Sequence, residues 1–238
     1  MIRINLWSGP RNVSTAMMYS FAQRADTTVV DEPLYAHYLV QTGLSHPGRE
    51  EVLDTQQHTA KEVIRDVLLG EYATPVAFFK QMAHHLVAME EDFMKGMKNV
   101  LLIRDPKFVI HSFAKVIPEP TLQDIGIARQ WKLFQDLQVM GDTPGILDSM
   151  YFLQNPEKIL TKLCEEYLDI PFDPAMLKWE AGARPEDGSW AEHWYNNVHQ
   201  STGFQPIVAK EVELADHLIP LWEESKPYYE KLMEYVIK

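Results

Sequence analysis

The sequence predicts an α/β fold, a three-layer αβα sandwich around a central parallel sheet. Short apolar runs alternate along the chain with longer segments of helical periodicity. The runs lack the polar alternation of half-exposed strands, and such runs are typical of strands that helices cover on both faces. The predicted strands are residues 2–7, 28–30, 76–79 and 100–103, with 145–147 as a fifth candidate.

The segments between these strands carry the helical pattern, at residues 14–24, 50–69, 84–97, 108–116, 125–140, 156–168 and 214–236. Pro156 followed by Glu157 indicates a helix start, because proline is tolerated in the first turn and a carboxylate suits the positive helix end. No repeat or linker divides the chain, so residues 1–238 are interpreted as one domain. Residues 178–207 lack periodicity and are predicted to form a lid or loop region.

Composition excludes several classes of protein. The chain has 238 residues, is 46% hydrophobic and carries a net charge of −12, which argues against a nucleic-acid or anionic-membrane surface. Cys164 is the only cysteine, so an intrachain disulfide and a cysteine-based zinc site are excluded. No apolar run is long enough to span a membrane, and residues 1–5 do not resemble a signal peptide. We therefore expect a cytoplasmic protein.

The turn after the first strand, residues 8–15, reads Ser-Gly-Pro-Arg-Asn-Val-Ser-Thr and is predicted to bind an anion. At the carboxyl end of a parallel strand, such a turn aims backbone N–H groups and a positive helix end at one point. Gly9 permits unusual backbone conformations, Arg11 adds a permanent charge, and Ser14 and Thr15 add hydroxyls. The alternative is an ordinary helix cap with a solvated arginine.

This turn departs from the Walker A pattern G-x-x-x-x-G-K-[ST]. Aligned from Gly9, Ser14 stands at the second glycine, Thr15 at the lysine and Ala16 at the hydroxyl that binds magnesium. A triphosphate-hydrolysing loop would therefore lack its main parts.

A second anion-binding segment follows the fourth strand, where Arg104-Asp105-Pro106 precedes a helix that carries Ser112 two turns on. Parallel strands end at the same edge of a sheet, so Arg104 is expected beside the first turn. Together the two segments resemble those of sulfotransferases that use 3′-phosphoadenosine 5′-phosphosulfate. Their 5′-phosphosulfate loop, Pro-Lys/Arg-Ser-Gly-Thr/Ser-Thr, is matched by Pro10, Arg11, Ser14 and Thr15, with Asn12 and Val13 in place of Ser-Gly. Their 3′-phosphate motif is Arg-[Asn/Asp]-Pro with a serine eight positions after the arginine, which is the spacing of Arg104 and Ser112.

The resemblance covers most of residues 1–175 and implies a P-loop NTPase-like fold and a donor that needs no metal. It implies that Ser8, Gly9, Pro10, Arg11, Asn12, Val13, Ser14 and Thr15 bind the 5′ end of the donor, and that Arg104 and Ser112 bind the 3′-phosphate. The reaction would transfer a sulfuryl group to a hydroxyl or amine of a small-molecule or carbohydrate acceptor. Val13 at a glycine position, and the carboxylates of Glu186 and Asp187 where the family has a basic loop, depart from the pattern.

By the same resemblance Arg11 and Lys80 would stabilise charge on the leaving phosphate, with Lys80 at the end of the third strand. Glu32, in the Glu-Pro-Leu segment after the second strand, would be the general base, its pKa raised by shielding from Tyr35 and Tyr38. His84 or His85 is the rival base, although helix-surface histidines are the simpler interpretation. Glu32 as a carboxylate in a strand-end turn closed by Pro33 or as a partner for Arg11, and Lys80 as a solvent-exposed lysine, also stay open.

Further expectations concern partners and alternatives. The spacing of the nine histidines does not favour a metal site. Trp190, Trp194 and Tyr195 would stack on a ligand or, more simply, attach the late segment to the core. The alternative functions are a nucleotide-dependent phosphotransferase (kinase) on the same fold, and a non-catalytic nucleotide-binding protein. The acceptor's identity is open, and so is a homodimer.

Overall fold

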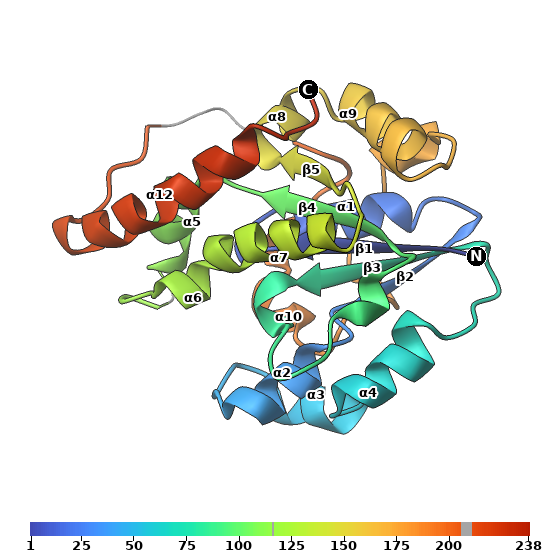
Figure 1. Ribbon diagram of the computed structural model, residues 1–238, viewed down its shortest axis with the longest axis horizontal. Helices are drawn as coiled ribbons and strands as arrows, with labels where there is room; N and C mark the ends of the chain where they lie inside the picture. The colour runs from blue at the N-terminus through green and yellow to red at the C-terminus, as the bar shows by residue number, and fades with distance from the viewer. Residues whose placement is uncertain (116, 206–210) are drawn as a thin grey trace.

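A computed structural model describes residues 1–115, 117–205 and 211–238 of the chain. Its centre is a parallel sheet of five strands in the order β2-β3-β1-β4-β5, which confirms the predicted α/β fold (Figure 1). The strands are β1 (Ile2–Ser8), β2 (Thr27–Asp31), β3 (Val76–Met82), β4 (Lys98–Ile103) and β5 (Gly145–Asp148). All five predicted strands are therefore present, and β3 extends past Lys80 rather than ending there.

Helices cover both faces of the sheet, which makes the three layers. Successive strand residues point to opposite faces, so Leu6 and Phe78 join one core while Trp7 and Phe79 join the other. One face is covered by α1 (Ser14–Phe21), α8 (Ser149–Gln154) and α9 (Pro156–Lys162). The other is covered by α5 (Pro106–Phe113), α6 (Leu122–Ile125), α7 (Ile127–Val139) and α12 (Ile219–Met233), with α7 lying across the sheet in Figure 1.

A smaller layer extends from the β2 edge. It consists of α2 (Tyr35–Thr42), α3 (Arg49–Thr55) and α4 (Ala60–Val63), which continues as a π-helical turn, Ile64–Leu68. The predicted helix at 50–69 is thus two helices, because Thr59 caps a new helix start by accepting the N–H of Glu62. Helix α2 was not predicted. Its residues pack with α10 (Ala191–Trp194), and α11 (Asn196–His199) follows directly.

The predicted helix at 84–97 is wrong. This stretch holds two short 3-10 turns, Ala83–His85 and Asp92–Met94, with Ala88 between them in the left-handed region at φ 47°. Methionines at helical spacing there pack into the core without a helix. Pro156 stands at the start of α9 and Pro106 at the start of α5, as predicted. Val116 of a predicted helix and residues 206–207 of the predicted loop region lie outside the described part of the chain.

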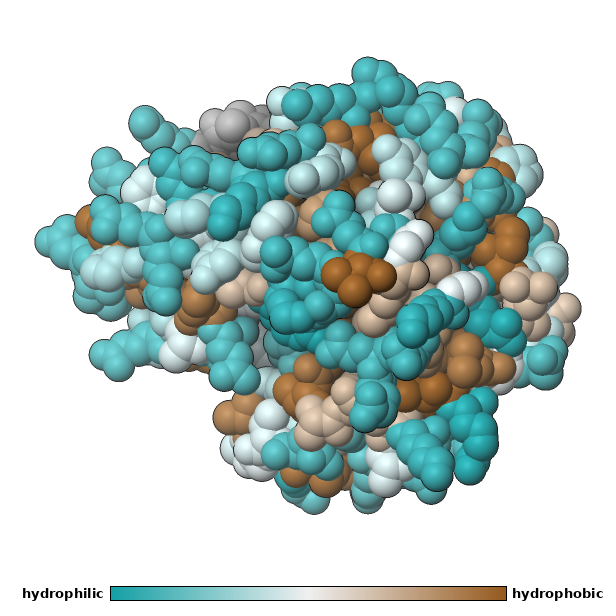
Figure 2. Space-filling view, in the orientation of Figure 1, coloured by the Kyte–Doolittle hydropathy of each residue, from teal (hydrophilic) through white to brown (hydrophobic). Residues whose placement is uncertain are grey.

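The surface seen in Figure 2 is mostly hydrophilic, with separate hydrophobic patches rather than one continuous apolar area. Within the described residues, no helix combines the length and apolar character needed to cross a membrane.

Candidate functional site

A cavity of about 770 Å³ lies over the carboxyl ends of the central strands. Several chain segments line it: the turn after β1, the β2–α2 connection, the loop after α2, the turn after β3, Arg104 with the end of α5, α6, and the late segment. The lining includes Gly9 to Thr15, Glu32, Lys80, His84, His85, Arg104 and Ser112. The structure therefore brings all the predicted site residues except Ser8 to one cavity.

The turn after β1 is fixed by Asn12 and Arg11. The Asn12 amide donates to Leu102 O on β4 (3.0 Å), and its Oδ1 accepts the N–H of Val13 (2.8 Å). Arg11 adopts φ 55°, in the left-handed region where residues with a side chain pay a steric penalty. The unusual backbone conformation is thus that of Arg11 and not of Gly9. Gly9 instead allows a close approach of two chain segments, because a Cβ there would lie 2.9 Å from Ile125 O.

Helix α1 begins without a side-chain cap. Val13 is the N-cap residue, at φ −92°, which suits any residue, and no side chain accepts from the first turn. The alternative interpretation, in which Ser14 or Thr15 merely caps the helix, is therefore wrong. Ser8 is fully buried, and its hydroxyl donates to Gly9 O (2.7 Å), outside the cavity lining.

Arg104 and Arg11 lie together at the carboxyl ends of the neighbouring strands β1 and β4. The Arg104 guanidinium donates to the carbonyl of Arg11, and Arg11 Nε donates to Ser112 Oγ (3.0 Å). Burial lowers the pKa of Arg104, and the charge of Arg11 lowers it further. Across the described chain neither arginine forms an ion pair with a carboxylate, and Arg104 Nε is buried without a hydrogen-bond partner. Two such cations beside an uncapped helix start make this part of the cavity positively charged.

Lys80 lies inside the protein, so the solvent-exposed alternative is wrong. Its ammonium donates to Asp31 Oδ1 (2.9 Å), Glu32 Oε1 (2.5 Å) and Tyr195 Oη (2.5 Å). Burial acts to lower the pKa of Lys80, but Asp31 and Glu32 outweigh it and raise the pKa well above its usual value. All three N–H groups are used within the protein. In this arrangement Lys80 holds Glu32 and has no proton left for a ligand.

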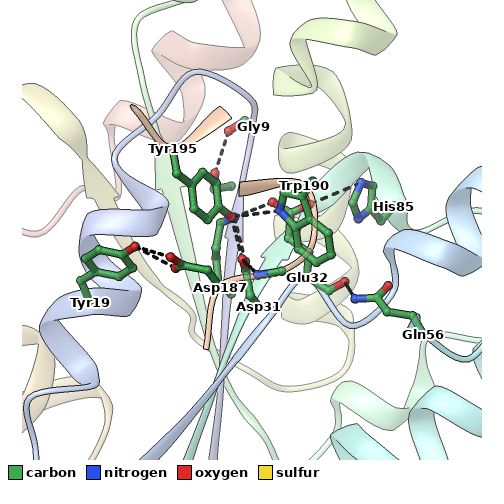
Figure 3. A network of polar contacts seen from close by, with 12 residues as sticks. Gly9, Tyr19, Asp31, Glu32, Gln56, His85, Asp187, Trp190 and Tyr195 are labelled. Carbon is green, nitrogen blue, oxygen red and sulfur yellow. Dashed lines mark hydrogen bonds and ion pairs between the residues drawn. The ribbon is translucent and has the colours of Figure 1, made fainter. Parts of the chain in front are cut away.

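Glu32 stands at a strained position, with φ 38°, between β2 and Pro33. Its backbone N–H donates to Lys80 O (2.8 Å), and its carbonyl accepts from Gln56 Nε2 (3.1 Å; Figure 3). Burial raises the pKa of Glu32, while the charge of Lys80 opposes that rise. The carboxylate is thus held in place and its pKa moves toward neutrality, as a general base requires.

His84 and His85 are not helix-surface residues. His85 stacks between Tyr35 and Tyr38, with ring centroids 4.9 and 4.7 Å away, and its Nε2 lies 3.9 Å from Glu32 Oε2. Burial lowers the pKa of His84 to about 4 and that of His85 well below its usual value. Both imidazoles are therefore neutral at pH 7, and His85 is the one near Glu32.

The late segment completes this network, which sequence reasoning missed (Figure 3). The Tyr195 hydroxyl donates to Asp31 Oδ2 (2.7 Å) and accepts from Trp190 Nε1 (3.1 Å). Asp187 accepts from the Tyr19 hydroxyl (2.7 Å) and contacts His199 Nε2 (3.0 Å). Trp190 and Tyr195 are buried, which confirms that these aromatics attach the segment to the core, although both also line the cavity. Asp31 had no signal beyond its place beside Glu32.

No group of three or more His, Cys, Asp or Glu side chains within residues 1–115, 117–205 and 211–238 is arranged to hold a metal ion.

Comparisons with known proteins identify the family of this chain. The model of a family described as the sulfotransferase domain matches residues 2–232, so the chain belongs to this family. The sulfotransferase domain of the Synechococcus PCC 7002 olefin synthase has the same fold, with a TM-score of 0.56, 19% identity, and coverage of 94% of this chain and 93% of that one.

Two curated relatives come from Arabidopsis thaliana. Branched-chain-amino-acid aminotransferase-like protein 1 is 40% identical over 234 residues, covering 98% of this chain and 42% of its own length. Branched-chain-amino-acid aminotransferase-like protein 2 is 37% identical over 227 residues, covering 92% and 40%. The chain thus spans about two-fifths of the length of these relatives.

Proposed function

We propose that this chain transfers a sulfuryl group from 3′-phosphoadenosine 5′-phosphosulfate to a hydroxyl or amine of a small molecule. One observation carries the proposal: Arg11 and Arg104, both without a carboxylate partner among the described residues, lie together on a cavity beside the uncapped start of α1. A ligand with phosphates at both ends would neutralise these two charges.

The residues present suit this donor. Arg11 and the backbone N–H groups of Ser14 and Thr15 would hold the 5′ end, and Arg104 and Ser112 the 3′-phosphate. The buried Nε of Arg104, which has no partner, supports an anionic neighbour. Val13 is compatible with this arrangement because its backbone does not need a glycine conformation.

The donor supplies the sulfuryl group and leaves as the bisphosphate. Glu32 accepts the proton of the acceptor as the acceptor oxygen or nitrogen bonds to sulfur and the bond from sulfur to the 5′-phosphate oxygen breaks. Arg11 stabilises the negative charge that develops on that oxygen. Lys80, with Asp31 and Tyr195, fixes the position of the Glu32 carboxylate.

The alternatives have less support. A kinase would need a magnesium-binding hydroxyl where Ala16 stands. The names of the Arabidopsis relatives suggest aminotransfer, in which a neutral lysine amine binds pyridoxal phosphate. Lys80, the one buried lysine of the described residues, is instead held as an ammonium by Asp31 and Glu32. A non-catalytic nucleotide-binding role, a cytoplasmic location and a homodimer stay predictions.

Calorimetric titration with 3′,5′-adenosine bisphosphate tests the donor site. We expect binding, and a loss of about 10–100-fold in affinity in Arg104→Ala, since a hydrogen bond to a charged group contributes about 1.5–3 kcal/mol. Arg65→Ala is the matched control, because that arginine is exposed and lies outside this cavity. No binding at high micromolar ligand, or equal affinity in Arg104→Ala and wild type, would refute the proposal.

The transfer itself is tested with radiolabelled donor and a panel of hydroxyl and amine acceptors. Glu32→Gln is expected to bind the bisphosphate and to lose transfer. Binding without transfer to any acceptor in wild type would favour the non-catalytic alternative, and magnesium-dependent ATP turnover would favour the kinase.

A further inference from the structure

The half of the cavity beyond Glu32 has a wall of aromatic rings. Tyr35, His85 and Tyr38 form a continuous stack, with centroids 4.9 and 4.7 Å apart. Trp190 meets the Tyr35 ring edge-on (5.1 Å), and His84 meets the Tyr38 ring in the same way (5.2 Å). These rings come from α2, the turn after β3 and the late segment, and all line the cavity. Such a wall suits a flat, apolar ligand body.

Two carboxylates lie beside this wall. Glu32 lies next to its central ring, with Oε2 3.9 Å from His85 Nε2. Asp124, in the first turn of α6, also lines the cavity and lies two residues before Gly126, where a Cβ would be 3.9 Å from His84 Nδ1. Burial raises the pKa of Tyr38 and the charge of Asp124 raises it further, while at His84 the same charge opposes the lowering caused by burial. Asp124 is therefore electrostatically close to the far end of the stack.

The charge of Asp124 is not balanced by a cation of the described residues. Its Oδ2 accepts both the N–H and the hydroxyl of Thr121 (2.8 Å each), and no lysine, arginine or histidine of the described chain forms an ion pair with it. The neighbouring histidines do not supply a charge, because burial lowers the pKa of His84 and of His46. Lys80 is occupied by Asp31 and Glu32. This half of the cavity is thus aromatic and negative.

We propose that the acceptor is an elongated molecule with its hydroxyl at one end, a flat apolar body, and a positively charged amine at the other end. This inference rests on the proposed function, since it places the hydroxyl at Glu32 and the donor at Arg11 and Arg104. The amine binds beside Asp124, where the carboxylate attracts it. An acceptor that carries a carboxylate at the same end is excluded by repulsion.

Three compounds of one skeleton test the charge requirement: tyramine, 4-propylphenol and 3-(4-hydroxyphenyl)propionate. They share a phenol and a two-carbon arm that ends in an ammonium, a methyl or a carboxylate. Binding of each to the protein saturated with 3′,5′-adenosine bisphosphate is measured by calorimetry. Tyramine is expected to bind at least about tenfold more tightly than 4-propylphenol, and the propionate least tightly. Sulfate transfer to the same compounds should follow this order in kcat/KM.

Asp124→Asn identifies the residue responsible. The amide oxygen keeps the acceptor for Thr121, so the fold of α6 is retained while the charge is lost. The affinity ratio of tyramine to 4-propylphenol should fall to near one in Asp124→Asn, and should be retained in Asp54→Asn, an exposed carboxylate outside the cavity.

Each outcome separates this inference from the function on which it rests. Three outcomes overturn the inference while bisphosphate binding stands. They are equal affinity for tyramine and 4-propylphenol, no binding of about 10 mM tyramine to the bisphosphate-saturated protein, and an unchanged affinity ratio in Asp124→Asn. Failure to bind the bisphosphate overturns the proposed function instead. In that case, calorimetric titration of tyramine into the bisphosphate-free wild type and into bisphosphate-free Asp124→Asn still measures binding at the aromatic subsite.

Discussion

Tyr195→Phe removes one hydroxyl from the most densely hydrogen-bonded part of the core. That hydroxyl accepts from Lys80 and from Trp190 and donates to Asp31, and all four side chains are buried. After the substitution a Lys80 proton and the Trp190 N–H have no partner. Asp31 keeps the ammonium of Lys80 and the N–H of Gly188 (3.2 Å). The ring still fills its place, so the loss is one of hydrogen bonds and not of packing.

The expected cost follows from these three bonds. Hydrogen bonds to charged groups contribute about 1.5–3 kcal/mol, and a buried neutral donor without a partner costs about 1–3 kcal/mol. Allowing for partial relaxation, Tyr195→Phe should lower the free energy of unfolding by about 4 kcal/mol, at the high end for a single substitution. For a chain of this size that corresponds to a fall of about 10 °C in Tm.

Urea unfolding, followed by circular dichroism, measures this loss, and a thermal scan gives the shift in Tm. Tyr151→Phe is the matched control, because Tyr151 is 41% exposed and the change in its unfolding free energy should stay within about 0.5 kcal/mol. A change below about 1 kcal/mol in Tyr195→Phe would refute the reasoning, since it would mean that the late segment does not complete the Lys80 network.

Two further predictions follow from the site. Burial lowers the pKa of His84 from 6.5 to about 4, so the folded state favours neutral imidazole; the stability this gives is complete above pH 6.5 and is lost as the pH falls toward 4. Between pH 7.5 and 4.5, His84→Gln should thus lose about 2 kcal/mol less unfolding free energy than wild type. This value is smaller than the full pKa shift would give, because the half-buried ring is partly screened by solvent. Identical pH dependence in urea unfolding would contradict this. Gly9→Ala places a Cβ 2.9 Å from Ile125 O, so the turn must move. The affinity for the bisphosphate, measured by calorimetry, should fall by about tenfold. An affinity equal to that of wild type would show that the turn tolerates the methyl group.

The strand pattern and the positions of the two arginine-bearing turns could be predicted because they depend on local sequence. The apolar runs identify β1 to β5, and Pro106 and Pro156 identify two helix starts, since each signal lies within a few residues of its effect. The same locality explains the errors. Residues 84–97 have methionines at helical spacing, yet Ala88 takes φ 47° and the chain turns twice to pack beside α2. Tertiary packing there outweighs the local pattern.

The sequence by itself determined the layers of the domain and the placement of Arg11 beside Arg104, because parallel strands bring the residues that follow them to one edge. The role of Glu32 as a base rests on the resemblance and stays a proposal. Only the tertiary structure decided that Lys80 is a buried partner of Asp31 and Glu32, that Tyr195 closes this network from 115 residues away, and that Asp124 stands beyond an aromatic wall. Whether a charge meets solvent, a ligand or another charge depends on segments distant in the chain, and spacing along one segment carries no information about them.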